Sequence, residues 1–270
     1  MKRKRKLLCV LLCIFAMCVS AFPVSAAVSS YVSGNYGTKT VGQYQVKVNQ
    51  NGLYSRRRYS GNWKKLASNC QTYTTNGSKI YFAKDNYNYS YDMGDAVIYS
   101  SSIKGGKKTR VATLHSRAVE GLYCYKDKLY VQERRGKHGD SIGVYSLKTH
   151  KYRILQSGIL LEAYGGYGIT TNSTYKWTYP LYSTNLSSGK RKKITSYCWG
   201  SKQSGKYLYF ASFTKNTRAY QNPGTFVVRR VSISGSGNKV LTRRLYGMVS
   251  NVTSKYVEYK RNGVTRRVYY

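Results

Sequence analysis

Acidic residues are scarce in this sequence. Nine Asp and Glu residues face 46 Lys and Arg residues, so the 270-residue chain carries a formal net charge of +37. A charge of this size does not specify a fold, but it favours polyanionic partners. It also leaves few candidates for hydrolysis of a glycosidic bond, which usually needs two opposed carboxylates.

Long apolar runs are absent after residue 22. Before that point, residues 2–6 are all Lys or Arg, residues 7–22 carry no charge, and Pro23 is followed by Val24-Ser25-Ala26. This order predicts a helical signal peptide over residues 1–26 that is cleaved after Ala26. The alternative is a retained membrane anchor, but a spanning helix needs about 20 apolar residues, and this run is shorter.

Removal of the signal would leave residues 27–270 as the mature, exported protein. The signal takes five basic residues with it, so 41 basic residues remain against nine acids, a net charge of +32. We expect a secreted protein, free or associated with the cell wall, with no transmembrane span after cleavage. Its polyanionic partner would be an anionic wall polymer or another glycan rather than nucleic acid, because nucleic acid is not found in that compartment.

Proline and helical periodicity are scarce too. Three Pro occur in the whole chain, and outside the signal the apolar residues come in short bursts separated by Gly, Ser, Asn and Lys. Thirty Tyr add to this pattern, because Tyr prefers half-buried strands with its hydroxyl facing water. The sequence therefore predicts an all-β protein.

Cysteine gives no sign of a metal site or a disulfide framework. Cys70, Cys124 and Cys198 remain after cleavage, and an odd number leaves at least one free thiol. Their spacings fit no metal-binding pattern, so we interpret them as small buried apolar side chains. No cofactor, metal ion or catalytic residue is predicted.

A hairpin with a basic turn recurs along the chain. Four segments start on an apolar burst and reach a closing apolar residue twelve positions after an equivalent starting position. The four pairs are Tyr54 and Leu66, Tyr99 and Val111, Tyr182 and Ile194, and Arg229 and Leu241. A fifth copy, from Gly143 to Ile154, has a tighter turn.

Further strand-like segments precede these hairpins, among them residues 78–82, 127–131 and 205–210. Together they give six units of roughly 40 residues with about four strands each, a pattern typical of β-propellers. The predicted fold is therefore a six-bladed β-propeller of four-stranded antiparallel blades. The last unit runs out one strand short, and we expect the segment Val28–Thr40 to supply the missing strand and close the ring.

The pattern Gly-x-x-Ile/Leu-Tyr-Phe, a loop, Ile/Leu-Tyr-Ser, Gly-Lys-Lys and Leu resembles the six-bladed propellers of the TolB-like and YWTD-type superfamily. It is most similar to the poorly characterised propeller domains of exported Gram-positive bacterial proteins. The resemblance covers nearly all of the mature chain and implies the fold, but a fold does not imply an activity. The Tyr-Trp-Thr-Asp tetrapeptide is absent, so a receptor-like ligand site does not follow.

Basic residues occupy one place in the repeat, the turn between the third and fourth strands. In a propeller these turns share one face, near the outer edge, so they would form a basic ring for a polyanion. The candidates are Lys64, Lys65, Lys107, Lys108, Arg110, Lys190, Arg191, Lys192, Lys193 and Lys239. The alternative is that surface hairpins tolerate lysine and that basic charge keeps strand edges apart.

Four longer loops are predicted to join the first two strands of their units and to lie on the opposite face. They are Asp85–Asp95, Glu133–Asp140, Thr171–Thr178 and Thr214–Gly224. Such loops are where selective recognition of a peptide, protein or glycan is expected. Tyr89, Asp92, Trp177 and Tyr220 are the candidate contacts.

Three acids, Asp85, Asp92 and Asp95, lie within one of these loops. Their oxygens would suit calcium or a sugar, but the spacing is not that of an EF-hand, and we interpret them as solvated surface acids. The sequence thus favours a non-catalytic binding or scaffold module at the cell surface. The rivals are a polysaccharide-active hydrolase or lyase that uses channel-lining acids and tyrosines, and a purely structural spacer.

Overall fold

The computed structural model describes residues 38–49, 51–70, 72–85, 94–134, 139–172, 178–219 and 221–270. The predicted signal peptide lies outside these ranges. Every regular element within them is a β-strand, as the sequence predicts. No helix in the described ranges is long and apolar enough to cross a membrane.

The first half of the chain forms three four-stranded sheets in which consecutive strands pair in antiparallel fashion. The first contains β1 (Lys39–Val41), β2 (Tyr44–Asn49), β3 (Gly52–Arg57) and β4 (Lys64–Ala67). The second contains β5 (Thr72–Thr75), β6 (Lys79–Asp85), β7 (Ala96–Ser102) and β8 (Thr109–Leu114). The third contains β9 (Ala118–Tyr125), β10 (Lys128–Arg134), β11 (Asp140–Ser146) and β12 (Tyr152–Ser157).

The second half forms a ten-stranded sheet. Its strands are β13 (Ile159–Tyr164), β14 (Tyr167–Thr171), β15 (Tyr179–Asn185), β16 (Arg191–Ser204), β17 (Tyr207–Phe213), β18 (Gly224–Ser232), β19 (Lys239–Val240), β20 (Leu245–Val252), β21 (Tyr256–Arg261) and β22 (Val264–Tyr269). The long strand β16 pairs with β15 through its first part and with β17 through its last part. It therefore ends one four-stranded group and begins the next.

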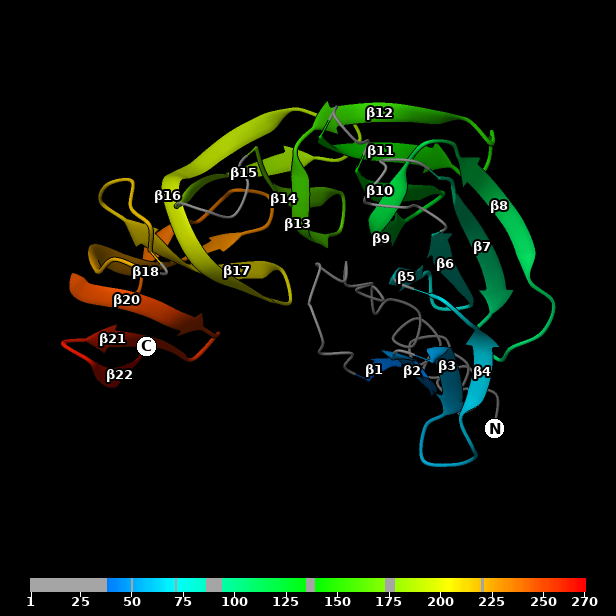
Figure 1. Cartoon of the computed structure of the whole chain (residues 1–270), viewed down its shortest axis with the longest axis horizontal. Helices are drawn as coiled ribbons and strands as arrows, with labels where there is room; N and C mark the ends of the chain where they lie inside the picture. Colours follow the sequence, from blue (N-terminus) through cyan, green and yellow to red (C-terminus); the bar gives the residue numbers. More distant parts are fainter. Residues whose placement is uncertain are drawn as a thin grey trace, which may run out of the picture.

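The sheets follow one another around a common centre (Figure 1). The group β1–β4 lies at one end of the arc and β20–β22 at the other, while β8 and β12 lie at the perimeter. Within the described residues, β22 pairs only with β21. This radial array of antiparallel sheets is the arrangement of a β-propeller.

The apolar core lies between neighbouring sheets. Alternate residues of β6 face opposite sides: Ile80 and Phe82 pack against the first sheet, whereas Tyr81 and Ala83 pack against the third. Three further clusters join the remaining neighbours in the same way, from the third sheet to β20–β22. Because each sheet between the two ends of the arc buries both faces against its neighbours, alternating side chains on its strands serve two different cores.

The repeated hairpin spacing is confirmed by the strand register. Tyr54 lies opposite Lys65, Tyr99 opposite Arg110, Tyr182 opposite Lys193, and Arg229 opposite Val240. In each pair the partner immediately precedes the closing apolar residue of the repeat. In the first three hairpins that closing residue lies at a β-bulge, where the register shifts. The twelve-residue interval therefore marks one pairing geometry used four times.

The position of the longer loops needs a correction. They join the second and third strands of their sheets, for example β6 and β7, and not the first and second. The strand nearest the centre is an additional one that precedes the repeated segments. The predicted closing segment is described only from residue 38, where Lys39 and Thr40 pair with β2; residues 28–37 lie outside the described ranges.

The three cysteines are free and buried. Burial raises the pKa of the Cys70 thiol to about 12 and that of Cys124 to about 11. Cys198 lies in the core between β14–β15 and β16–β18. These positions confirm the interpretation as small apolar core residues.

Candidate polyanion-binding surface

The predicted basic residues lie where the outermost strand of a sheet begins. Lys64 and Lys65 open β4, Lys107 and Lys108 lead into β8 with Arg110, and Lys239 opens β19. Residues 190–193 lead into and open β16. All ten side chains are exposed.

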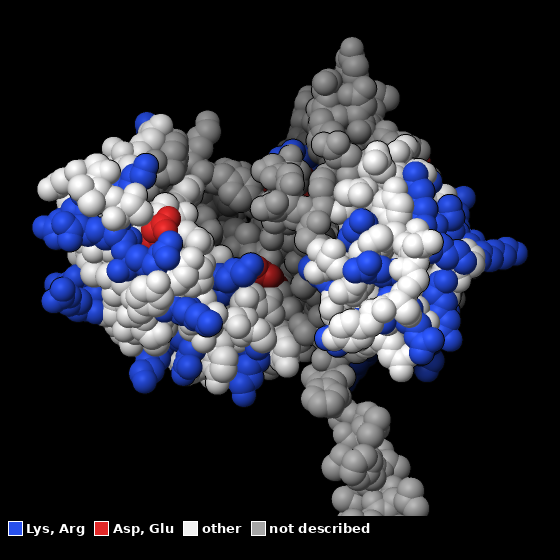
Figure 2. Space-filling view, turned by 90° about the horizontal axis from the view of Figure 1, so that it is seen from below, with Lys and Arg blue, Asp and Glu red and all other residues white. Residues whose placement is uncertain are grey.

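Strand direction puts these turns on one face. Because neighbouring strands are antiparallel, turns between the third and fourth strands lie at one end of every sheet. The longer loops between the second and third strands lie at the other end, as do the links from one sheet to the next. Viewed from below, Lys and Arg cover both ends of the arc, and only isolated Asp and Glu appear, one in the hollow between the ends (Figure 2).

Aromatic rings make cation–π contacts with several basic side chains of these sheets. On the first sheet the Lys47 ammonium lies 4.3 Å from the centroid of the Trp63 ring, and the Arg56 guanidinium lies 4.6 Å from it. Among the strands β13–β16, the Arg191 guanidinium lies 4.0 Å from the centroid of the Tyr182 ring. Such cation–π contacts limit the freedom of long side chains while leaving their charge in solvent.

Sequence reasoning missed Lys47, Arg56 and Trp63 as parts of this surface. Lys47 lies on β2, opposite Tyr54 of β3, and Tyr54 in turn lies opposite Lys65 of β4. The only local signal was Trp63 directly before the Lys64-Lys65 pair. The neighbour on β2 becomes visible only once the register is known.

The best-buried acid, Glu133, serves the fold. Its carboxylate is fully buried and accepts hydrogen bonds from Ser141 at 2.8 Å, from the Arg117 guanidinium at 3.2 Å and from the Tyr152 hydroxyl. These partners come from β11, the start of β9 and β12, so the network ties one sheet together. A carboxylate with this many donors and no exposed surface is a structural ion pair.

Most other described acids also pair with a cation. Glu120 and Asp140 both approach Arg134, each with an oxygen 3.8 Å from its Nε. Asp95 accepts a hydrogen bond from the Ser116 backbone and lies 2.8 Å from Nδ1 of His115. The Ser116 amide and His115 lower the pKa of Asp95. Among the described residues, no group of three or more His, Cys, Asp and Glu could hold a metal.

Glu162 differs from these acids, because no cation lies within ion-pair distance of it in the described ranges. It projects from β13, and burial raises its pKa to about 7, while the charges of Lys202 and Lys39 oppose this shift. Lys202 belongs to the last part of β16 and Lys39 to β1. Three central strands thus contribute one acid and two bases to the same region.

The four candidates on the opposite face are not described. Tyr89, Asp92, Trp177 and Tyr220 lie outside the described residues. The described chain continues at Gly94 shortly before β7, at Thr178 directly before β15, and at residue 221 before β18, which begins at Gly224. The prediction of a ligand site on these loops therefore stays a prediction.

Comparison with solved structures places the fold. An oligogalacturonate lyase solved in complex with manganese superposes with a TM-score of 0.52 and 10% identity, over 87% of this chain and 77% of the lyase. The two proteins share a fold. At this identity the likeness carries no activity across.

Two further structures superpose less well. A protein described as TolB from Agrobacterium tumefaciens gives a TM-score of 0.49 and 12% identity over 83% of this chain and 89% of its own. Puromycin hydrolase gives a TM-score of 0.49 and 10% sequence identity, over 88% of this chain and 41% of the hydrolase chain. The sequence matches no protein-family model and no curated protein.

Proposed function

We propose that this chain is an exported propeller that binds an anionic cell-wall polymer through its basic turns and carries out no catalysis. The observation that carries the proposal is the common register of the turns. In three hairpins a tyrosine lies opposite a Lys or Arg, and further exposed cations precede that Lys or Arg in the turn. A repeating polymer would meet cations at repeating intervals around such a ring.

The excess of positive charge favours binding of a polyanionic partner over a role in solubility alone. Most described acids are already paired with a cation, so the exposed lysines of the turns are not neutralised within the protein. Solubility alone requires a far smaller net charge than the +32 that 41 basic and nine acidic residues give the mature chain. Polyanion binding would release counterions and would therefore weaken as salt increases.

The ring itself is part of the proposal. Division of the ten-stranded sheet within β16 and after β19 would leave five four-stranded groups and the three-stranded group β20–β22, which supports the proposal of six blades. The outer strand β22 is mostly exposed, with one partly buried residue, as expected of an edge that lacks a neighbour. Residues 28–37 would supply that neighbour, and their removal from the mature chain should lower the unfolding temperature.

The direct test is retention of the mature protein on purified cell wall, with and without its teichoic acid, across a salt series. The variant Lys190→Gln/Lys192→Gln/Lys193→Gln should elute at clearly lower salt than the wild type. Arg191 is kept, because it donates a hydrogen bond to Asn172 at 2.7 Å. The matched control, Lys84→Gln/Lys215→Gln/Lys260→Gln, removes the same charge from the opposite end of the sheets and should elute near the wild type.

Two results would contradict the proposal. One is retention that does not depend on teichoic acid or on salt. The other is equal weakening by the test and control variants, which would mean that only net charge matters.

A second candidate function is cleavage of an acidic polysaccharide in the central hollow. It is favoured by Glu162, whose pKa of about 7 suits a general acid or base near neutral pH. Lys39 and Lys202 would hold the substrate's negative charges. Release of unsaturated or reducing ends from polygalacturonate by the wild type, and its loss in Glu162→Gln, would support this function over the first.

A further inference from the structure

A groove of about 390 Å³ opens between β18 and the strands β20–β22. Four arginines line it: Arg243 and Arg244 from the link between β19 and β20, Arg261 at the end of β21, and Arg266 on β22. The groove lies at the end of the sheets that carries the longer loops. It is therefore on the opposite face from the lysine-bearing turns.

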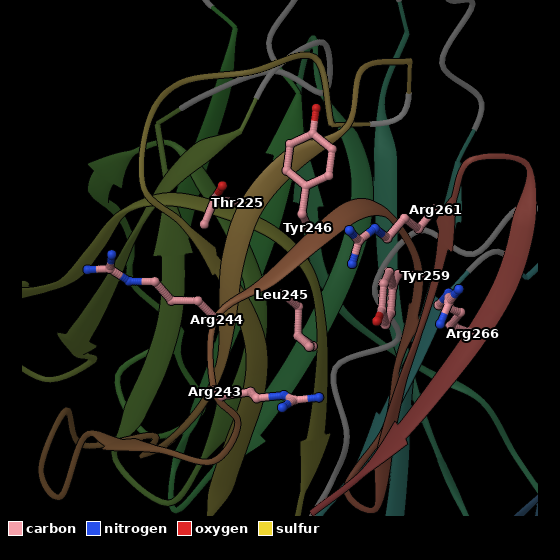
Figure 3. Close-up of a pocket in the computed structure, with 8 residues that line it drawn as sticks. All are labelled: Thr225, Arg243, Arg244, Leu245, Tyr246, Tyr259, Arg261 and Arg266. Atoms are coloured by element: carbon pink, nitrogen blue, oxygen red, sulfur yellow. The ribbon is translucent and has the colours of Figure 1, made fainter.

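Strand pairing fixes the positions of these side chains. Arg266 lies directly opposite Tyr259 on the neighbouring strand. Gly247 lets β21 come close, because a β-carbon there would overlap the Lys260 carbonyl oxygen and the Tyr259 ring. The close-up shows Arg261 above the Tyr259 ring and Arg266 beside it, with Arg243 extending towards the same side, while Arg244 extends away (Figure 3).

The cations in the groove have no partner of their own. None of the four arginine side chains makes a hydrogen bond, ion pair or ring contact in the described part of the chain. The nearest acid along the chain, Glu258, points to the other face of β21 and is occupied by Arg267 at 2.9 Å and by Ser250. Strand alternation enforces this separation, because Glu258 and Tyr259 are adjacent residues.

Tyr259 adds a further donor. Its ring packs edge-on against Phe226, with centroids 5.6 Å apart, and the residue is only 6% exposed. Within the described ranges its hydroxyl makes no hydrogen bond, although it lines the groove. Tyr259 thus brings one hydroxyl without a described partner to a groove that four arginines line.

We propose that this groove is a binding site for a compact oxyanion, a phosphate or a carboxylate group. Guanidinium groups present paired N–H donors that match the oxygens of either group, whereas lysine acts as a point charge. Three converging arginines without counter-charge repel one another, and a bound oxyanion relieves this repulsion. The site is independent of polymer binding by the lysine turns, so either one can fail without the other.

The test is calorimetric titration of the mature protein with inorganic phosphate and, separately, with galacturonate. The wild type should bind at least one of them, and Arg261→Gln/Arg266→Gln should weaken that binding at least ten-fold. The control Arg57→Gln/Arg58→Gln removes two exposed arginines from the first sheet and should bind as the wild type does. Arg261→Lys/Arg266→Lys should also lose affinity, because it keeps the charge and loses the paired donors.

The pattern of outcomes identifies the ligand group or overturns the site. Binding of phosphate alone assigns the groove to a phosphate group, binding of galacturonate alone to a carboxylate, and binding of both to either oxyanion. Absence of binding by the wild type to both probes overturns the proposal. So does equal affinity of the wild type and the Arg261→Gln/Arg266→Gln variant, provided that their unfolding temperatures agree.

Discussion

Tyr152 lies over Gly143, in the space that a β-carbon at position 143 would occupy. Gly143 is on β11 and Tyr152 on the outer strand β12 of the same sheet. The tyrosine hydroxyl passes over the glycine and donates a hydrogen bond to the buried carboxylate of Glu133. A glycine in the repeat thus makes room for the ring that completes a buried polar network.

Gly143→Ala should destabilise the protein by about 2 kcal/mol, the usual range for overpacking a core. The added methyl group would displace Tyr152 and weaken its hydrogen bond to Glu133. The free energy of unfolding in urea measures the effect. Gly166→Ala is the control, because its β-carbon would lie 3.4 Å from the Tyr125 ring, an ordinary contact; equal losses in both variants would contradict the explanation.

Glu133→Gln should cost about 3 kcal/mol, since removal of one partner leaves the other charge of a buried pair uncompensated. The remaining charge is Arg117, whose side chain is only 20% exposed. Unfolding of Glu258→Gln provides the comparison, because Glu258 forms a more exposed pair with Arg267. A Glu133→Gln variant as stable as Glu258→Gln would show that the buried network contributes little.

The sequence predicted the sheets because strands that pair with each other are close together in the sequence. A tyrosine and the cation opposite it are eleven residues apart in one hairpin, as for Tyr54 and Lys65, so the register appears as a fixed spacing. The longer loops were assigned to the wrong pair of strands, since the innermost strands precede the repeated hairpins and carry no comparable pattern.

Long-range sites were beyond such reasoning. The arginines of the groove come from a link and two strands, and only the fold brings Arg243 near Arg266. The central group of Glu162, Lys202 and Lys39 likewise draws on three strands far apart in the sequence. Comparison of repeated segments detects only features that recur, and each of these clusters occurs once.

Glu162 should titrate near pH 7. Burial raises its pKa, and the positive charge of Lys202 lowers it, so Lys202→Gln should raise the pKa further, whereas Lys206→Gln should leave it unchanged. Carbon-13 NMR of labelled glutamate in the mature protein follows this carboxyl directly. A pKa that falls in Lys202→Gln would contradict the placement of the two groups.

The same shift makes stability depend on pH. The folded protein holds a proton on Glu162 up to about pH 7, whereas the unfolded chain releases it near pH 4.5. Because the folded state binds more protons in this window, stability should fall as pH rises from about 4.5 to 7. Glu162→Gln should show a flatter profile of unfolding free energy across that window.

Trp63 should report polymer binding. Lys47 and Arg56 both lie over its ring, and Trp63 directly precedes the basic pair Lys64 and Lys65 on the face proposed to bind polymer. A polyanion that draws these cations away would change the surroundings of the indole. Addition of purified teichoic acid should therefore change the tryptophan fluorescence, and salt should reverse the change because exposed ionic contacts are screened.

Two variants show which tryptophan gives the fluorescence change. Trp63→Phe should abolish most of the fluorescence change while the protein still binds the wall. Trp199→Phe should retain the change, because Trp199 packs against the core cluster of β17–β21 and edge-on to Tyr179. A change that persists in Trp63→Phe and disappears in Trp199→Phe would place the polymer away from the basic turn of the first sheet.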